Sequence, residues 1–253
     1  MPSPTFAQIT PRIFKLELPF FNFPVGVFLV RGDDGWTVID AGAPGAEDVV
    51  LQQILAQTGG SRPKRLLLTH GHYDHGAAAA RIHDEWRAPI AAGRAELPYL
   101  LGAERYRRIP SRSLAYPLLQ ISPPALFGRN VQLPLDEGMM IDGMEVFHVT
   151  GHAPGMVALL HRADRALLCA DTFTNLNGRL GDPPGAFTYD IALNHRAQAK
   201  LAALDFDHLL VSHGAPILNE GRTRAQELLA SREKEKAKFS SRLREWLLGP
   251  KAA

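Results

Sequence analysis

Three histidines and one aspartate lie within six consecutive residues of this 253-residue chain. The segment reads His70-Gly71-His72-Tyr73-Asp74-His75. In an extended loop, residues two apart leave the same side of the backbone, so His70 and His72 can face one centre. Imidazole and carboxylate groups together suit zinc, iron and manganese ions, whereas clustered imidazoles without a ligand leave buried nitrogen atoms unsatisfied. The segment therefore predicts a metal site.

Three further residues are candidate ligands because each follows an apolar run that predicts a strand. They are His152, Asp171 and His213. Loops that follow strand ends are where α/β folds often carry functional groups. The other histidines lie inside a predicted helix or strand, or next to polar residues, and we expect them not to bind metal. They are His83, His148, His161, His195 and His208.

Alternating strands and helices would position these residues. Strands are predicted by apolar–polar alternation or by short apolar runs, at residues 13–18, 25–31, 36–40, 65–69, 89–92, 143–150, 156–161, 166–170 and 209–212. Helices are predicted at residues 47–57, 75–86, 194–204 and 223–248. This alternation in both halves of the chain predicts the α/β class, with two sheets sandwiched between helices.

We expect one domain over residues 1–253, with two segments that depart from this rhythm. Residues 94–134 are rich in proline and aromatic residues and are predicted to form a pocket-lining insertion, or else a structural excursion packed on its own core. Residues 172–190 are predicted to form a Gly/Pro-rich loop. The helix at 223–248 carries apolar residues at helical spacing, which favours docking on the same domain, with a dimer contact as the alternative.

The composition is typical of a soluble globular protein, with 45% hydrophobic and 21% charged residues. The net charge of +2 requires neither nucleic acid nor a membrane as partner. The single cysteine, Cys169, excludes an internal disulfide, and we interpret it as a buried strand thiol. The sequence shows no apolar run of membrane-spanning length and no secretory signal pattern at its start, so we expect a cytoplasmic protein.

The sequence resembles the metallo-β-lactamase superfamily over about residues 12–215. The turn Asp40-Ala41-Gly42 after a strand carries part of the resemblance. The rest is carried by an ordered set of metal-ligand types, His70, His72, Asp74, His75, His152, Asp171 and His213. The resemblance implies a four-layer αβ/βα sandwich of two mixed β-sheets flanked by helices.

The resemblance also implies two divalent metal ions, most simply Zn²⁺, with Mn²⁺ or Fe as alternatives. One ion would be held by His70, His72 and His152, the other by Asp74, His75 and His213, with Asp171 between them and Asp40 orienting a ligand. A metal-bridging hydroxide would be the nucleophile. Asp74 would be the catalytic group that orients it and moves a proton.

The resemblance leaves the reaction open. With aspartate at position 171, the chain resembles those members of the superfamily that hydrolyse esters, lactones and thioesters. The leading hypothesis is therefore hydrolysis of a small ester, lactone or thioester. The alternatives are a mononuclear iron persulfide dioxygenase, a β-lactamase, a phosphodiesterase and a non-enzymatic ligand-binding module. We expect a small-molecule substrate, no nucleic-acid or membrane partner, and a monomer or homodimer. The candidate substrate-binding residues are Tyr99, Tyr106, Phe173 and Tyr189.

Overall fold

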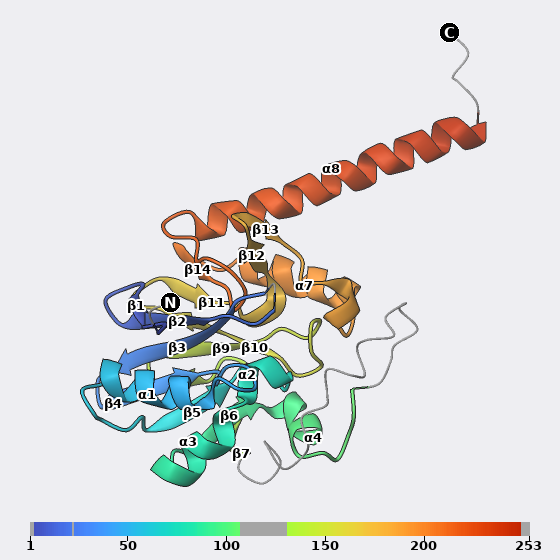
Figure 1. Ribbon diagram of the computed structural model, residues 1–253. Helices are drawn as coiled ribbons and strands as arrows, with labels where there is room; N and C mark the ends of the chain where they lie inside the picture. Colours follow the sequence, from blue (N-terminus) through green and yellow to red (C-terminus); the bar gives the residue numbers. More distant parts are fainter. Residues whose placement is uncertain (1–2, 22, 107–130, 249–253) are drawn as a thin grey trace.

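The computed structural model describes residues 3–21, 23–106 and 131–248. Two mixed β-sheets lie face to face, and helices cover their outer faces (Figure 1). The layers follow the order helix, sheet, sheet, helix. This arrangement confirms the fold class that the sequence predicted.

The first sheet has seven strands in the order in which they occur along the chain. They are β1 (Ala7–Gln8), β2 (Ile13–Leu18), β3 (Val25–Gly32), β4 (Gly35–Ile39), β5 (Arg65–Leu68), β6 (Ile90–Gly93) and β7 (Val131–Leu135). β1 to β4 are antiparallel, and β4 to β7 are parallel. Helices α1 (Glu47–Gln57) and α3 (Ala79–Trp86) pack on its outer face. Because both faces are covered, β5 and β6 are almost entirely apolar.

The second sheet has the strand order β14-β11-β10-β9-β8. The bounds of these strands are His208–Leu210, Ala166–Leu168, Val157–His161, Met144–His148 and Met140–Ile141. Helix α7 (Ile191–Ala202) and the start of α8 (Gly221–Leu248) cover its outer face. Asp190 caps α7, because its carboxylate accepts hydrogen bonds from the backbone N–H groups of Ala192 (2.8 Å) and Leu193 (2.9 Å).

The central core lies between the two sheets, and strand alternation determines which side chains enter it. Phe28 and Val30 of β3 point into this core, whereas Val27 and Leu29 of the same strand pack toward α1 and α3. Leu67 of β5 also enters the central core. These apolar residues pack the two sheets against each other. The polar groups lie in the loops at the shared edge of the sheets.

The segment that was predicted to be an irregular loop contains a hairpin. Within residues 172–190 the structure has a hairpin of β12 (Thr174–Leu176) and β13 (Arg179–Gly181), preceded by η2 (Ala170–Thr172) and followed by η3 (Gly185–Phe187). Its turn is Asn177-Gly178, with φ of 52° and 73°, a pair that favours tight hairpins and that the prediction missed.

The predicted insertion at 94–134 is described only at its two ends. It begins with η1 (Arg94–Glu96) and α4 (Leu97–Leu100), and β7 starts at Val131. Residues 107–130 lie outside the described residues. The assignment of this segment as a pocket wall therefore stays a prediction.

Helix α8 begins two residues before its predicted start and docks only through its first turns. Leu228 and Leu229 pack against the core below α7, whereas residues 233–240 are exposed, Phe239 at 69%. Figure 1 shows the rest of the helix extending away from the sheets. The expected docking thus holds only for the first turns of the helix, because the rest of the helix extends beyond the sheets and α7. Among the described residues, no helix combines the length and apolar character that crossing a membrane requires.

Candidate metal centre

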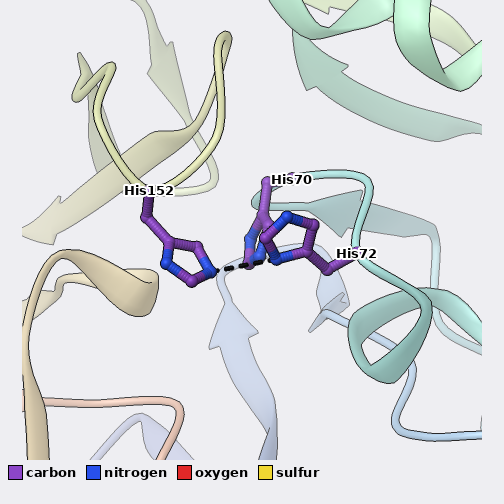
Figure 2. Close-up of side chains that lie close together, drawn as sticks. All are labelled: His70, His72 and His152. Atoms are coloured by element: carbon purple, nitrogen blue, oxygen red, sulfur yellow. Dashed lines mark hydrogen bonds between the residues drawn. The ribbon is translucent and has the colours of Figure 1, made fainter. Parts of the chain in front are cut away.

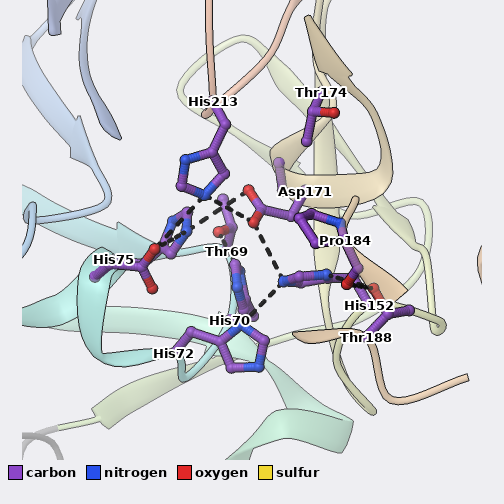
Figure 3. Close-up of polar contacts among 12 residues, drawn as sticks. Thr69, His70, His72, His75, His152, Asp171, Thr174, Pro184, Thr188 and His213 are labelled. Atoms are coloured by element: carbon purple, nitrogen blue, oxygen red, sulfur yellow. Dashed lines mark hydrogen bonds and ion pairs between the residues drawn. The ribbon is translucent and has the colours of Figure 1, made fainter. Parts of the chain in front are cut away.

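Loops at one edge of the two sheets bring all seven candidate ligands together. Figure 3 labels six of them, all except Asp74. His70 follows β5, and His72, Asp74 and His75 lie at or within the short helix α2 (Tyr73–Gly76). The other three follow strands of the second sheet: His152 comes after β9, Asp171 lies in η2 after β11, and His213 follows β14. Each sheet therefore contributes part of the cluster from its strand ends.

The first half of the cluster consists of His70, His72 and His152, which we call the three-histidine half. One ring nitrogen from each lies within 4.8 Å of the other two. His152 Nε2 is 2.9 Å from His72 Nδ1, and Figure 2 shows the three rings converging. All three residues are at most 2% exposed. Three buried imidazoles from two sheets thus face one point.

The second half consists of Asp74, His75 and His213, which we call the carboxylate half. Asp74 Oδ2 lies 3.8 Å from His75 Nε2 and 3.6 Å from His213 Nε2. Asp171 lies between the halves. Its Oδ2 is 3.0 Å from His213 Nε2 and 3.2 Å from His152 Nε2, and its Oδ1 is 3.6 Å from His75 Nε2. One carboxylate therefore reaches histidines of both halves.

Hydrogen bonds on the far side of the rings determine which nitrogen faces the cluster. His75 Nδ1 donates to Asp40 Oδ2 (2.9 Å), and His213 Nδ1 donates to the Pro24 carbonyl (2.9 Å). Carboxylate and carbonyl oxygens only accept, so Nδ1 carries the proton in both rings. The Nε2 lone pair of each ring is then available to a metal ion.

Asp40 links the two halves through its hydrogen bonds. It follows β4 with φ of 60°, is fully buried, and accepts from the Thr69 backbone N–H (2.8 Å) and hydroxyl (2.9 Å) as well as from His75. Because the Thr69 hydroxyl donates to Asp40, it accepts from His70 Nδ1 (3.0 Å). Asp40 thus orients His75 directly and His70 through Thr69.

The charges of the cluster suit metal binding. Burial, followed by the neighbouring histidines, holds the pKa of His70 and of His72 well below the usual value. Burial tends to raise the pKa of Asp171, but His213, His75 and His152 outweigh it and hold that pKa well below its usual value. Neutral His70 and His72 and an ionised Asp171 are the protonation states that metal ligands need.

Several buried atoms of the cluster lack the hydrogen bonds that such atoms normally make. His70 Nε2, His75 Nε2 and Asp171 Oδ1 have no hydrogen-bond partner in the structure. Buried polar atoms without a partner are rare in folded proteins, and each calls for an explanation. Divalent metal ions bound to these atoms would supply it, so the donor set fits the metals that the sequence predicted.

A cavity opens above the cluster. Its polar floor contains Asp74, Asp171 and three of the histidines. Its walls are mainly aromatic and are formed by Phe20, Phe23, Tyr73, Thr174, Pro184 and Phe187. Among the described residues, no lysine or arginine lines it. The cavity therefore offers apolar contacts above two carboxylates.

The four aromatic residues that the sequence marked as candidate substrate contacts do not line this cavity. Tyr106 is buried, and its ring lies 5.0 Å from that of Tyr99. Phe173 is fully buried, and Tyr189 packs against the same core. Aromatic side chains fill cores as readily as they line cavities. Their role as substrate contacts therefore stays a prediction, and the described wall of this cavity uses other aromatic residues.

Sequence reasoning also missed Glu96, a fully buried carboxylate behind the three-histidine half. Burial raises its pKa, and hydrogen bonds from Tyr106 and from the backbone of Gly155 and Gly71 oppose that shift. A glutamate four residues after a predicted strand looks like an ordinary surface charge. Gly71 and Gly155, which lie near the candidate histidines in the sequence, were the signal that could have indicated its position, since glycine permits close approach of other groups.

Residues 22–213 match the metallo-beta-lactamase superfamily, and the chain belongs to this superfamily. This confirms the resemblance seen in the sequence. The chain is 29% identical to the probable metallo-hydrolase YybB of Bacillus subtilis (strain 168) over 208 residues, which are 81% of this chain and 87% of that protein. It is 25% identical to hydroxyacylglutathione hydrolase GloC of Haemophilus influenzae over 159 residues, which are 60% and 69% of the two chains.

Among solved structures, TTHA1623 in a di-iron-bound form shares the fold with a TM-score of 0.57 and 26% sequence identity. The similarity covers 88% of this chain and 97% of that one. Taken together with the His/Asp cluster, the superfamily indicates a metal-dependent hydrolase with sites for two metal ions.

Proposed function

We propose that the protein hydrolyses a small, uncharged ester, lactone or thioester with two divalent ions, most simply Zn²⁺. One observation carries this proposal: the ligand cluster, which contains buried nitrogen and oxygen atoms without a partner, lies at the floor of a cavity whose walls are mainly aromatic. The likeness to a hydroxyacylglutathione hydrolase supports hydrolysis of an acyl bond of this kind.

The two halves would each hold one ion. His70, His72 and His152 would hold the first, Asp74, His75 and His213 the second, and Asp171 would contact both. Bound divalent ions supply Lewis acidity, which lowers the pKa of a water molecule and polarises a substrate carbonyl.

Asp74 would transfer the proton in this reaction. It lines the cavity with a side chain that is 14% exposed, whereas Asp171 is nearly buried. Its Oδ2 lies within 3.8 Å of two histidine Nε2 atoms. From there the carboxylate can accept a proton from an attacking water molecule and then donate it to the leaving group.

The cavity walls favour an uncharged acyl group. Phe20, Phe23 and Phe187 offer apolar surface, and the described wall has no cation to pair with a carboxylate or phosphate. A carboxylate at the end of the acyl chain would lose water against this wall without gaining a charged partner, so the wall favours an uncharged acyl chain.

A matched pair of substrates tests this proposal. Butyryl and succinyl thioesters of one thiol present acyl chains of similar length, but only the succinyl chain ends in a carboxylate. For the protein loaded with zinc or manganese, we expect two ions per chain. We also expect a kcat/KM for the butyryl thioester at least about tenfold higher, because the succinyl carboxylate would be desolvated against the apolar wall without a partner.

Three outcomes would overturn the proposal. One is a single iron per chain with oxygen uptake on a persulfide. Another is faster turnover of β-lactams or phosphodiesters than of any ester, lactone or thioester. The third is tight binding of a small molecule with no turnover of any substrate, which would indicate a binding module.

A further inference from the structure

Glu96 joins the two loops that carry the three-histidine half. Its Oε1 accepts hydrogen bonds from the Gly71 backbone N–H (3.0 Å) and from the Tyr106 hydroxyl. Its Oε2 accepts from the Gly155 backbone N–H (2.6 Å). Gly71 lies between His70 and His72, and Gly155 lies three residues after His152. One buried carboxylate therefore binds the backbone of the His70–His72 loop and the backbone of the His152 loop.

The surrounding backbone is packed too closely for these loops to move independently. A Cβ atom on Gly155 would lie 2.0 Å from the Glu96 nitrogen, and one on Gly93 would lie 2.3 Å from the Gly155 oxygen. A Cβ atom on Gly71 would meet the Tyr106 hydroxyl at 2.8 Å. The absence of these Cβ atoms lets η1 lie directly against both ligand loops.

We propose that Glu96 is a positioning residue that sets the spacing between the His70–His72 loop and the His152 loop, and hence the geometry of the three-histidine half. The proposal rests on the metal centre of the proposed function. A metal ion needs its ligand atoms at nearly fixed separations, and the groups that orient ligands affect metal affinity strongly. Glu96 touches neither substrate nor metal in this arrangement, so its effect is exerted through the backbone of Gly71 and Gly155.

The substitution Glu96→Gln tests this role because it keeps the size of the side chain. An amide has one accepting oxygen and one donating NH₂ group, so at least one of the three donors would face another donor. The matched control is Asp164→Asn. Asp164 is also a buried carboxylate that accepts a backbone N–H, from Arg12 (2.9 Å), and a hydroxyl, from Thr10. It lies in the turn between β10 and β11, at the opposite end of β11 from Asp171.

Zinc affinity is measured by competition with a chromophoric chelator, and coordination geometry by the visible spectrum of the cobalt-substituted protein. For Glu96→Gln we expect one of the two zinc sites to weaken by about 10- to 100-fold, with altered cobalt bands, while the other site is retained. Asp164→Asn should bind both ions as the wild type does, even where its thermal stability falls. Tyr106→Phe, which removes one donor, should shift affinity in the same direction by less.

The results separate this proposal from the proposed function. If the wild type binds no divalent ion tightly, the proposed function itself is overturned. If the wild type binds two ions, and Glu96→Gln has unchanged affinity and cobalt spectrum, only the role of Glu96 is overturned. An equal loss in Asp164→Asn would also overturn that role. If Glu96→Gln does not fold, Tyr106→Phe decides, and unchanged zinc affinity there would overturn the proposal.

Discussion

The two halves of the metal centre differ in their exposure to the cavity. The three-histidine half is buried, and Glu96 ties its two loops together from behind. In the carboxylate half, the side chains of Asp74 and His213 are 14% and 9% exposed and line the cavity. Both halves reach the cavity, the first through His72 and His152 and the second through Asp74 and His213, but the second half is the more exposed.

The halves differ in charge as well. Burial and neighbouring imidazoles lower the pKa of His70 and of His72. Burial acts in the same direction on His75 and His213, but Asp171 and Asp74 outweigh it and raise the pKa of both. His70 and His72 thus offer neutral ligands, whereas the carboxylate half balances opposite charges.

This difference indicates that the two halves of the site have different roles. The buried half depends on accurate spacing, which the backbone and Glu96 supply. The open half carries the carboxylate that can move a proton. Substitutions should therefore separate the two halves, unless they remove a group that both halves share.

The largest effect is expected for Asp171→Ala, because Asp171 reaches His152, His213 and His75. Without this carboxylate, both halves lose a ligand, and three buried histidines lose the charge that they face. We expect the purified variant to hold fewer than two ions per chain, by elemental analysis, and to lose turnover. The control Asp164→Asn should keep two ions per chain and full turnover. Two tightly bound ions in Asp171→Ala would show that the halves do not share this residue.

Asp74→Ala should separate the halves. Turnover should fall by about 10²- to 10⁴-fold, the range of general acid–base catalysis. The three-histidine half should still hold its ion, so one ion per chain should remain, and thermal unfolding should stay close to that of the wild type. An exposed aspartate on α3, replaced as Asp84→Ala, is the control. Full activity in Asp74→Ala would exclude it as the group that moves the proton.

Asp40→Asn tests the hydrogen bonds behind the carboxylate half. The amide has one accepting oxygen and cannot serve the Thr69 backbone N–H, the Thr69 hydroxyl and His75 together, so the hydrogen bonds that orient His75 would be disturbed. We expect one ion to bind about 10- to 100-fold more weakly, as for other groups that orient a metal ligand. Chelator competition measures this loss.

Thr69→Val serves as the matched variant for Asp40→Asn. It leaves the Asp40–His75 hydrogen bond intact and removes the hydroxyl that faces His70. Its weaker site should therefore be the three-histidine one, which a cobalt spectrum different from that of Asp40→Asn would show. Identical spectra would mean that the halves are not held separately.

The ligand positions could be predicted from the sequence because strands of strong apolar pattern precede them. Leu66-Leu67-Leu68 leads directly to His70, and Leu209-Leu210 leads to His213. Such patterns determine where a strand ends. They do not determine which strand ends meet, and that part of the prediction came from the resemblance to a family.

The cavity wall and Glu96 could not be predicted in this way. Phe20 and Phe23 lie between β2 and β3, and Phe187 follows a hairpin in a Gly/Pro-rich segment without periodicity. Nothing local distinguishes them from the buried Phe173. Glu96 is buried because its backbone donors come from residues 25 and 59 positions away. Local patterns carry no information on such contacts.

The smallest effect is expected for Phe187→Ala, which changes the wall and neither half of the metal centre. Loss of part of an apolar contact should cost about 1 kcal/mol, or roughly fivefold in kcat/KM for the butyryl thioester, mainly through a higher KM. Zinc affinity should stay unchanged, because Phe187 lies in the wall and belongs to neither half of the ligand cluster. Phe239→Ala, on the exposed part of α8, is the matched control and should leave both unchanged. A loss of zinc affinity in Phe187→Ala would show that the wall and the ligands form one unit.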